Sequence, residues 1–447
     1  MVDEGTLAEA SQRDDVVDVA GVAVPTGIAE PTAPRPRVVI VAEAWGSNWG
    51  ERAAATRMVA GALALRASVS IVSIEDRSNA GYRQPRLRYD GVFPVYSSPA
   101  PVGRGDSVGA DAPRDNPLHL GLVRASLMRQ AGGFLPEIAA EGILASAALP
   151  SMEAAATVLS CEPDVVVLAG PATFWLGDAL PVEPGRPRVV LLPLSGDDPV
   201  LSSAAFGRVL SPVDGVGAFS GGEYDRIARL GTSDAFPRLY HLQLALPVNR
   251  LAAAAGMAGL AAFGRYVLVI SAFGDDPANG RCPPHDYLRH VFGSVSIAEV
   301  RRNRWLVTSA SGRRFDPVWA PTRMNLWRLM ARADVTVDLR SPGPIGREAI
   351  ESLRFGTPVV VPDGSVAAEH ARQSNGGLWY RNPGEMADCA RTLLHDEALR
   401  SRLGASGEEW AERHHGDTDT FVETATRLVL GSPPASSRSP APAARSA

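Results

Sequence analysis

The sequence contains no lysine, and all 44 of its basic residues are arginines. A Walker-type phosphate-binding loop, a Schiff-base enzyme and a pyridoxal phosphate enzyme each need a lysine amine, so these three classes are excluded. Cysteine is also scarce. Cys161, Cys282 and Cys389 lie far apart in the chain and form no C-x-x-C pair, which predicts reduced thiols rather than a disulfide framework.

Long apolar runs are missing as well. No stretch of about 18 apolar residues is present that could span a membrane, and residues 1–18 lack the basic segment and apolar core of a secretory signal. We therefore expect a cytoplasmic protein without a transmembrane segment, while peripheral contact with a membrane stays open. The net charge of −5 provides no basic field that would bind nucleic acid.

The chain of 447 residues, 45 % of them hydrophobic, is long enough for two domains with sizeable cores. Short apolar strands alternate with helical stretches, the pattern of an α/β fold with parallel sheets. Residues 1–36 and 431–447 lack this periodicity and predict a disordered leader and a disordered tail. Between them we predict an N-terminal Rossmann-like domain at 37–243, a C-terminal Rossmann-like domain at 244–416 and a helix at 417–430.

One stretch in the second half of the chain is the most informative. Residues 333–339 alternate and are rich in β-branched side chains, which predicts a strand. A run of helix formers begins at Gly346. Gly356 lies where a left-handed residue that ends a helix is favoured, and Pro358 prevents the helix from resuming. Residues 359–361 then form the next buried strand. The stretch therefore predicts a right-handed strand–helix–strand crossover.

The loop before this helix is a candidate anion site. Unpaired N–H groups and the helix dipole attract a phosphate to a helix N-terminus, and Gly343 and Gly346 let the backbone approach it closely. Glu348 and Glu351 lie one turn apart on one face of the helix, so that a carboxylate can accept hydrogen bonds from hydroxyl groups. The alternative is that both acids only complement the helix dipole.

The stretch resembles the C-terminal half of retaining GT-B glycosyltransferases, which use sugar nucleotides and carry an E-x7-E motif. The residues that match the family pattern in register are Gly346, Glu351, Gly356, Thr357, Pro358, Val359 and Val360. The resemblance implies two Rossmann-like domains that face a cleft, a nucleotide-sugar donor, and a small-molecule, lipid or glycan acceptor. It implies no metal and no other cofactor. It also implies that Glu351 binds the ribose hydroxyls and that the 417–430 helix packs back on the N-terminal domain.

The chain departs from the family pattern at three places. The first glutamate of the motif, which contacts the donor sugar in the family, falls on Gly343. The family's diphosphate-binding Arg and Lys are absent from residues 271–280, and its N-domain histidine is absent from residues 192–196. A leaving diphosphate needs positive charge or aimed N–H groups. We therefore expect Arg347 and Arg340 to be phosphate ligands; the alternative is that Arg347 pairs with the glutamate four residues further on.

A second candidate surface lies in the N-terminal domain. A loop connects the predicted strand 37–43 to the predicted helix 51–65. The candidate acceptor-side residues in this loop are Trp45, Gly46, Asn48, Trp49 and Gly50. The tryptophans could stack on a sugar or an acceptor, with core packing as the alternative.

Groups of potential metal ligands are incomplete. Asp417 and Asp419 suggest an acid pair, but isolated Asp pairs usually mark turns and helix caps. His285 and His290 lie near Cys282 without a fourth ligand. We therefore expect no metal site.

Two functions follow from the sequence. The first is a glycosyltransferase that moves a sugar from a nucleotide donor to an acceptor. The second is a catalytically degenerate protein of the same architecture, which acts as a binding or scaffold partner. The departures from the family pattern keep the second function open, and the sequence identifies no catalytic residue.

Overall fold

The fold is described from a computed structural model of the chain. The residues that it describes are 34–43, 45, 51–75, 86–90, 93–99, 148–170, 173–174, 176–180, 185–194, 196, 206, 209–210, 213–231, 237–256, 264–270, 285–293, 295–301, 304–315, 322–339, 343 and 345–431. Nearly all of the predicted leader and tail lies outside the described residues, so that their disorder stays a prediction.

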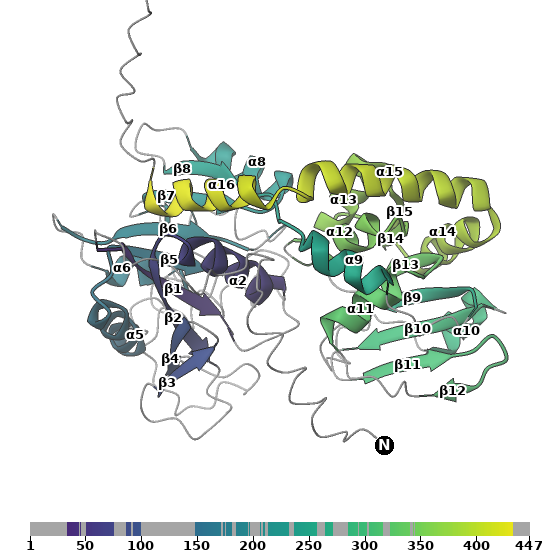
Figure 1. Ribbon diagram of the computed structural model, residues 1–447, viewed down its shortest axis with the longest axis horizontal. Coiled ribbons are helices and arrows are strands. Elements are labelled where there is room, and N and C mark those ends of the chain that lie inside the picture. The colour runs from purple at the N-terminus through teal and green to yellow at the C-terminus, as the bar shows by residue number, and fades with distance from the viewer. Residues whose placement is uncertain are drawn as a thin grey trace, which may run out of the picture.

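An eight-stranded sheet organises the first half of the chain (Figure 1). The strand order is β3-β4-β2-β1-β5-β6-β7-β8, and all neighbours are parallel except β3 and β4. The strands are β1 Arg37–Glu43, β2 Ser68–Glu75, β3 Arg86–Asp90, β4 Phe93–Pro99, β5 Val165–Ala169, β6 Arg188–Leu192, β7 Gly215–Ala218 and β8 Arg238–His241. The helices are α2 Glu51–Ala64, α5 Ala148–Ser160, α6 Leu176–Ala179 and α8 Gly221–Leu230.

Strands β1 and β5 at the centre of this sheet have a continuous apolar run, Val38–Ala42 and Val165–Ala169, because both faces of the sheet are covered. Val38 and Ile40 of β1 belong to a core that includes residues of α2, whereas Val39 and Val41 belong to a core that includes residues of α5. All residues of β5 are buried. A strand covered on both faces needs no alternation of polar and apolar residues.

A seven-stranded sheet organises the second half, in the order β12-β11-β10-β9-β13-β14-β15. The neighbouring strands β10, β9, β13, β14 and β15 are parallel to one another. Strands β11 and β12 form an antiparallel edge next to β10. The strands are β9 Tyr266–Ile270, β10 Ser296–Arg301, β11 Arg304–Thr308, β12 Arg314–Phe315, β13 Val335–Asp338, β14 Val359–Pro362 and β15 Gly377–Tyr380. The helices are α9 Val248–Gly256, α10 His285–Phe292, α11 Arg323–Met330, α12 Arg347–Arg354, α13 Val366–Ser374, α14 Pro383–His395 and α15 Glu397–His415.

Two largely parallel sheets with helices packed on them confirm the predicted α/β fold with two Rossmann-like domains. The structure places the last strand of the first sheet at His241 and the first strand of the second sheet at Tyr266. The boundary that we draw between residues 243 and 244 lies in this interval and stays a prediction.

The chain passes between the two domains twice, at neighbouring places. The first crossing leads from β8 to α9, and the second leads from α15 to α16, Thr418–Leu430. In the first crossing, the N–H group of Leu246 donates to the carbonyl of His415 at 2.8 Å. Helix α16, yellow in Figure 1, lies against the first sheet, where Arg188 Nη2 donates to the carbonyl of Leu428 at 3.0 Å. The two crossings therefore hold each other in place.

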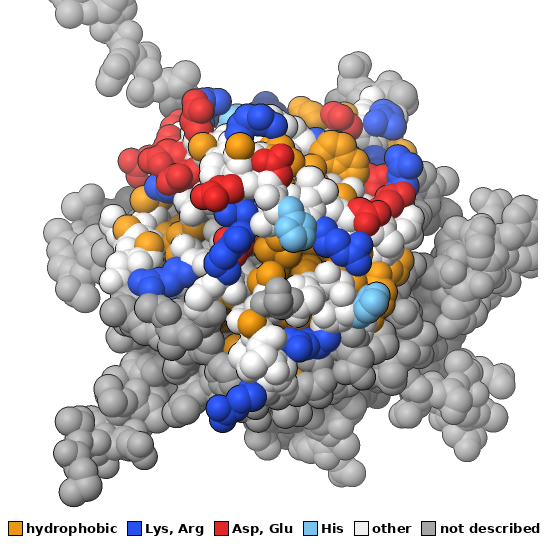
Figure 2. Space-filling model, turned by 90° about the vertical axis from the view of Figure 1, so that its right-hand side faces the viewer, with side chains coloured by type: hydrophobic (Ala, Val, Ile, Leu, Met, Phe, Trp, Pro, Cys, Tyr) orange, Lys and Arg blue, Asp and Glu red, His pale blue; other side chains and the backbone are white. Residues whose placement is uncertain are grey.

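The outer face of the C-terminal domain carries both signs of charge. Figure 2 shows arginine side chains and acidic side chains interspersed over the described part of this face. Among the described helices, none is long and apolar enough to cross a membrane.

A buried histidine lies between the two crossings. Nδ1 of His415 donates to the carbonyl of Leu244 at 2.7 Å. The ring meets the ring of His370 edge-on, with 5.9 Å between centroids. Burial, together with the nearby His370, lowers the pKa of His415 to about 3. The imidazole is therefore neutral in the folded protein at neutral pH.

We expect the free energy of unfolding to fall as the pH is lowered from about 6.5 to about 3. In this window the unfolded chain protonates His415 and the folded chain does not, so that each pH unit removes up to about 1.4 kcal/mol. The variant His415→Asn keeps a side-chain N–H donor but cannot titrate. Urea unfolding at pH 7 and pH 4.5 should therefore show a smaller loss for the variant than for the parent, and an equal loss would contradict the role of His415.

Candidate functional site

The candidate site lies where the second sheet reverses its strand order. Strand β9 has β10 on one side and β13 on the other, and the chain leaves β13 to enter α12. Ligands of open α/β sheets bind at the carboxyl ends of strands beside such a point. The first sheet reverses its order between β1 and β5, and β1 leads towards α2. Hydrogen bonds from the loop before α12 to the first residue of α2 show that the two points face each other.

The loop before α12 enters the helix through a left-handed residue. Gly346 is the N-cap of α12, with a φ of 67°. A Cβ at this position would lie 2.9 Å from the backbone nitrogen of Ala367, so that both the conformation and the space require glycine. The carbonyl of Ile345 accepts a hydrogen bond from Nε2 of the buried His370 at 2.8 Å. These contacts fix the first N–H groups of α12.

Four charged side chains meet between α11 and α12. Glu351 is 0 % exposed and Glu348 is 1 % exposed. Arg323 of α11 donates from Nη1 to Glu348 Oε1 at 2.6 Å and from Nε to Glu351 Oε1 at 3.2 Å. Its Nη2 donates to Glu351 Oε2. Arg347 donates from Nε to Glu351 Oε1 at 2.8 Å. Both oxygens of Glu351 therefore accept hydrogen bonds from arginines.

The two arginines differ in their electrostatic surroundings. Burial alone would lower the pKa of Arg323, but Glu351 and Glu348 outweigh burial and the pKa of Arg323 is raised. Burial and the neighbouring Arg323 together lower the pKa of Arg347 below its ordinary value, despite the same two carboxylates. Arg347 is therefore the less compensated cation of the pair. An additional anion beside Arg347 would restore part of this compensation.

The sequence predicts Glu351, Glu348 and Arg347 in this site but not how they are connected. Arg347 makes the i,i+4 ion pair with Glu351 that the sequence leaves open as an alternative. Sequence reasoning misses Arg323. Its signal is the preceding Thr322, whose side chain caps α11 and places a cation in the unfavourable first turn of the helix.

A carboxylate from the first domain reaches the start of α12. Glu51 is the first residue of α2 and is 7 % exposed. Its Oε2 accepts hydrogen bonds from the N–H groups of Ile345 at 3.0 Å and of Gly346 at 3.2 Å. A Cβ on Gly343 would lie 2.4 Å from this oxygen. An anionic group therefore occupies the helix N-terminus that the sequence predicts as an anion site.

The predicted acceptor-side loop is described only at Trp45. This residue is 1 % exposed and packs edge-on against Phe93, with 6.0 Å between ring centroids. Its position corresponds to the core-packing alternative. The predicted site residues that lie outside the described part of the chain are Arg340, Gly46, Asn48, Trp49 and Gly50. Their roles stay predictions.

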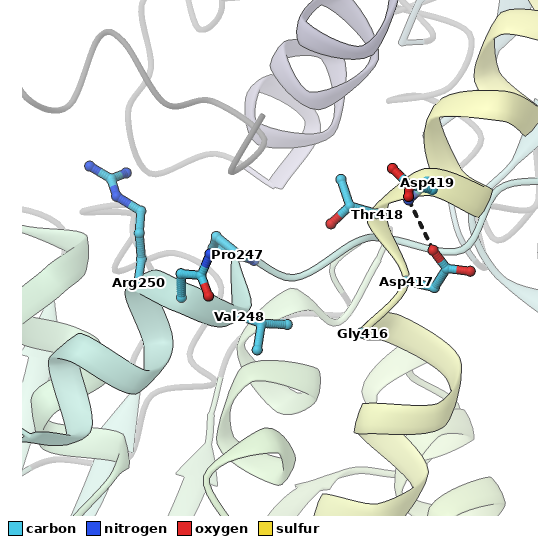
Figure 3. A pocket seen from close by; sticks show the side chains of 8 residues that line it. Pro247, Val248, Arg250, Gly416, Asp417, Thr418 and Asp419 are labelled. Atoms are coloured by element: carbon cyan, nitrogen blue, oxygen red, sulfur yellow. Dashed lines mark hydrogen bonds between the residues drawn. The ribbon is translucent and has the colours of Figure 1, made fainter. Parts of the chain in front are cut away.

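Cavities lined by described residues also lie outside the charged cluster. A cavity of about 470 Å³ is lined by residues of α8 and α13, among them Arg226 and Glu369. A cavity of about 350 Å³ lies at the two domain crossings, where Figure 3 shows Arg250 on one side and Asp417 on the other.

One aspartate of the second cavity serves as a helix cap. Asp417 is the N-cap of α16 and accepts hydrogen bonds from the N–H groups of Asp419 at 2.9 Å and Thr420 at 3.1 Å. This arrangement agrees with the capping role that the sequence favours over an acid pair for a metal. Among the residues that the structure describes, no group of three or more potential metal ligands occurs.

The comparisons with known proteins fit this geometry. Residues 318–410, which include α11 and α12, match the family model described as Glycosyl transferases group 1. No curated protein matches the sequence. Similar solved structures include sucrose-phosphate synthase from Thermosynechococcus elongatus, with 12 % identity over 88 % of this chain and 98 % of that chain and a TM-score of 0.57.

Two further structures cover similar shares of the chain. The α,α-trehalose-phosphate synthase (UDP-forming) from Burkholderia vietnamiensis has 13 % identity, covers 89 % of this chain and 100 % of that chain, and has a TM-score of 0.58. HepE from Anabaena, in complex with UDP and glucose, has 14 % identity, covers 89 % of this chain and 99 % of that chain, and has a TM-score of 0.52. The fold likeness and the family match confirm the resemblance to GT-B glycosyltransferases that the sequence predicts.

We expect Glu351→Ala to destabilise the protein by about 3–5 kcal/mol, because the change leaves two largely buried guanidinium groups without their shared carboxylate. Urea unfolding followed by circular dichroism measures the loss. The matched control is Glu423→Ala, which removes an exposed carboxylate paired with Arg427 on α16 and should cost less than about 1 kcal/mol. Similar losses in the two variants would show that the buried cluster is no more important than a surface pair.

Proposed function

We propose that this protein is a glycosyltransferase that moves a sugar from a nucleotide donor to an acceptor in the cleft between its two domains. The observation that carries the proposal is the match of residues 318–410 to glycosyl transferases, since this segment includes the charged cluster of α11 and α12. The occupants of the HepE structure, UDP and glucose, suggest a uridine nucleotide as the first donor to test. The cytoplasmic location expected from the sequence belongs to this proposal.

The donor would lie across the start of α12. Phosphate oxygens would accept hydrogen bonds from the first N–H groups of the helix, where Gly343 and Gly346 allow a close approach. Arg347, together with Arg340 as the sequence predicts, would supply positive charge. The bond between the anomeric carbon and a diphosphate oxygen breaks, the oxygen of an acceptor hydroxyl bonds to that carbon, and the hydroxyl proton passes to the released diphosphate. Negative charge then builds on the leaving diphosphate, and these groups would stabilise it.

Ribose binding by Glu351 would require an exchange of partners. Glu351 Oε1 accepts hydrogen bonds from both Arg347 and Arg323. A diphosphate carries more charge than a carboxylate and would attract the less compensated Arg347 away from Glu351. The released oxygen could then accept a hydrogen bond from a ribose hydroxyl, and Glu348 is the second carboxylate on the same face of the helix.

The alternative is a catalytically degenerate GT-B protein that acts as a binding or scaffold partner. The observations that favour it are the glycine at position 343 in place of the family's donor-contacting glutamate and the absence of the Arg and Lys from residues 271–280. The acceptor, whether a small molecule, a lipid or a glycan, would in the enzyme lie on the side of the first domain.

We expect the full-length protein to bind UDP and a UDP-sugar in isothermal titration calorimetry. We also expect Glu351→Gln to weaken the binding roughly ten- to a hundredfold, because a neutral amide is a poorer acceptor for ribose hydroxyls than a carboxylate. Glu423→Gln, on the exposed face of α16, is the control and should bind as the parent does. If the parent binds none of a panel of nucleoside diphosphates and nucleotide sugars, the scaffold function is supported instead.

A separate expectation concerns Arg347. If it holds the diphosphate, Arg347→Ala should lower the affinity for UDP and make the affinity less dependent on salt, since one ion contact between the protein and the diphosphate is lost. Titrations at two salt concentrations measure both effects. Arg427→Ala on α16 is the matched control. Unchanged affinity and unchanged salt dependence in Arg347→Ala would reject the phosphate role while leaving the enzyme function open.

A further inference from the structure

The two domains contact each other through one carboxylate from each domain. Glu51 of the first domain accepts hydrogen bonds from Ile345 and Gly346 at the start of α12 in the second domain. In the opposite direction, Glu369 of α13 accepts hydrogen bonds from the N–H group of Gly221 at 2.9 Å and that of Gly222 at 3.2 Å, at the start of α8 in the first domain. Each domain thus places a carboxylate on a helix N-terminus of the other. We call these two contacts the reciprocal clasps.

At both clasps a glycine makes room for the carboxylate. A Cβ on Gly343 would lie 2.4 Å from Oε2 and 2.7 Å from Cδ of Glu51. A Cβ on Gly221 would lie 2.6 Å from Oε1 of Glu369. Both distances are too short for any carbon atom, so that a side chain at either position would drive the carboxylate out. Both clasps therefore combine a carboxylate, the N–H groups at a helix N-terminus and a glycine, although the two helices belong to different domains.

The Glu51 clasp lies between two helix N-termini. Glu51 is the first residue of α2, and its carboxylate accepts hydrogen bonds from the N–H groups of Ile345 and of the N-cap Gly346, directly before α12. The start of α2 is tied to its own domain, because Nε of Arg52 donates to the carbonyl of Leu194 at 2.9 Å. The positive ends of two helix dipoles therefore meet at one carboxylate. The same N–H groups are those that a phosphate of the donor would use.

We propose that the reciprocal clasps hold the unliganded domains together, and that Glu51 does so as an internal anion that the donor diphosphate must displace. The second half of this proposal rests on the proposed function. Two anions cannot share the N–H groups of Ile345 and Gly346, because each needs the same donors and their charges repel. The carboxylate thus keeps the buried N–H groups satisfied in the empty protein. When a diphosphate binds, it displaces the carboxylate of Glu51, so that donor binding is coupled to release of this clasp.

The first experiment compares anion binding to the full-length parent and to Glu51→Gln, with inorganic pyrophosphate and UDP as the probes. The glutamine keeps the shape of the side chain and can still accept a hydrogen bond, so that the fold should persist, which circular dichroism checks. We expect both probes to bind about tenfold more tightly to the variant.

The outcomes of this experiment separate the clasp from the proposed function. A gain for pyrophosphate without any UDP binding supports the displaceable clasp and rejects the nucleotide-dependent function. Unchanged or weaker binding of both probes by Glu51→Gln overturns the proposal, as does weaker binding of UDP alone, which would make Glu51 a ligand of the donor. Glu423→Gln is the control for the loss of one surface charge and should leave both affinities unchanged.

The second experiment tests the clasps without any ligand. Small-angle X-ray scattering measures the radius of gyration of the parent, of Glu51→Gln, of Glu369→Gln and of the double variant. We expect the double variant to have the larger radius, because both interdomain contacts lose their charge. The control Glu423→Gln should match the parent. A double variant with the radius of the parent would overturn the role of the clasps in holding the domains together.

Discussion

The buried N–H groups at the start of α12 impose the constraint on which the rest of the site depends. A helix leaves its first N–H groups without partners inside the helix, and such groups need an acceptor when they are shielded from water. Here the acceptor is Glu51, 294 residues from Ile345 in the chain. This contact requires a bare backbone at Gly343 and a domain arrangement that brings α2 to α12. The conformation of the loop before α12 and the arrangement of the two domains therefore depend on each other.

The absence of lysine is compatible with this site because the buried contacts need the geometry of arginine. The guanidinium of Arg323 donates to Glu348 and Glu351 at the same time, and from three nitrogens. An ammonium group is a compact charge and does not match two carboxylates with a planar fork. Arg323 therefore connects α11 to α12, while Arg347, the first residue of α12, donates to Glu351.

The strand–helix–strand unit around α12 could be predicted from local signals. Gly346 and Gly356 both adopt a positive φ at the ends of the helix, and β13 and β14 flank it as the apolar runs indicate. The shared face of Glu348 and Glu351 also follows from helical spacing. The partners of these carboxylates could not be predicted in the same way. Arg323 lies 28 residues before Glu351, and packing of α11 on α12 brings the two together rather than any periodicity.

The charged side chains near the start of α12 influence anion binding jointly. Arg323 and Arg347 donate to the carboxylates of Glu348 and Glu351, while the carboxylate of Glu51 accepts hydrogen bonds from the N–H groups of Ile345 and Gly346. The negative charge of Glu51 at this place opposes a diphosphate. Without this carboxylate, the N–H groups of Ile345 and Gly346 lose an acceptor. Movement of one carboxylate thus changes both the charge and the hydrogen-bonding capacity of the site.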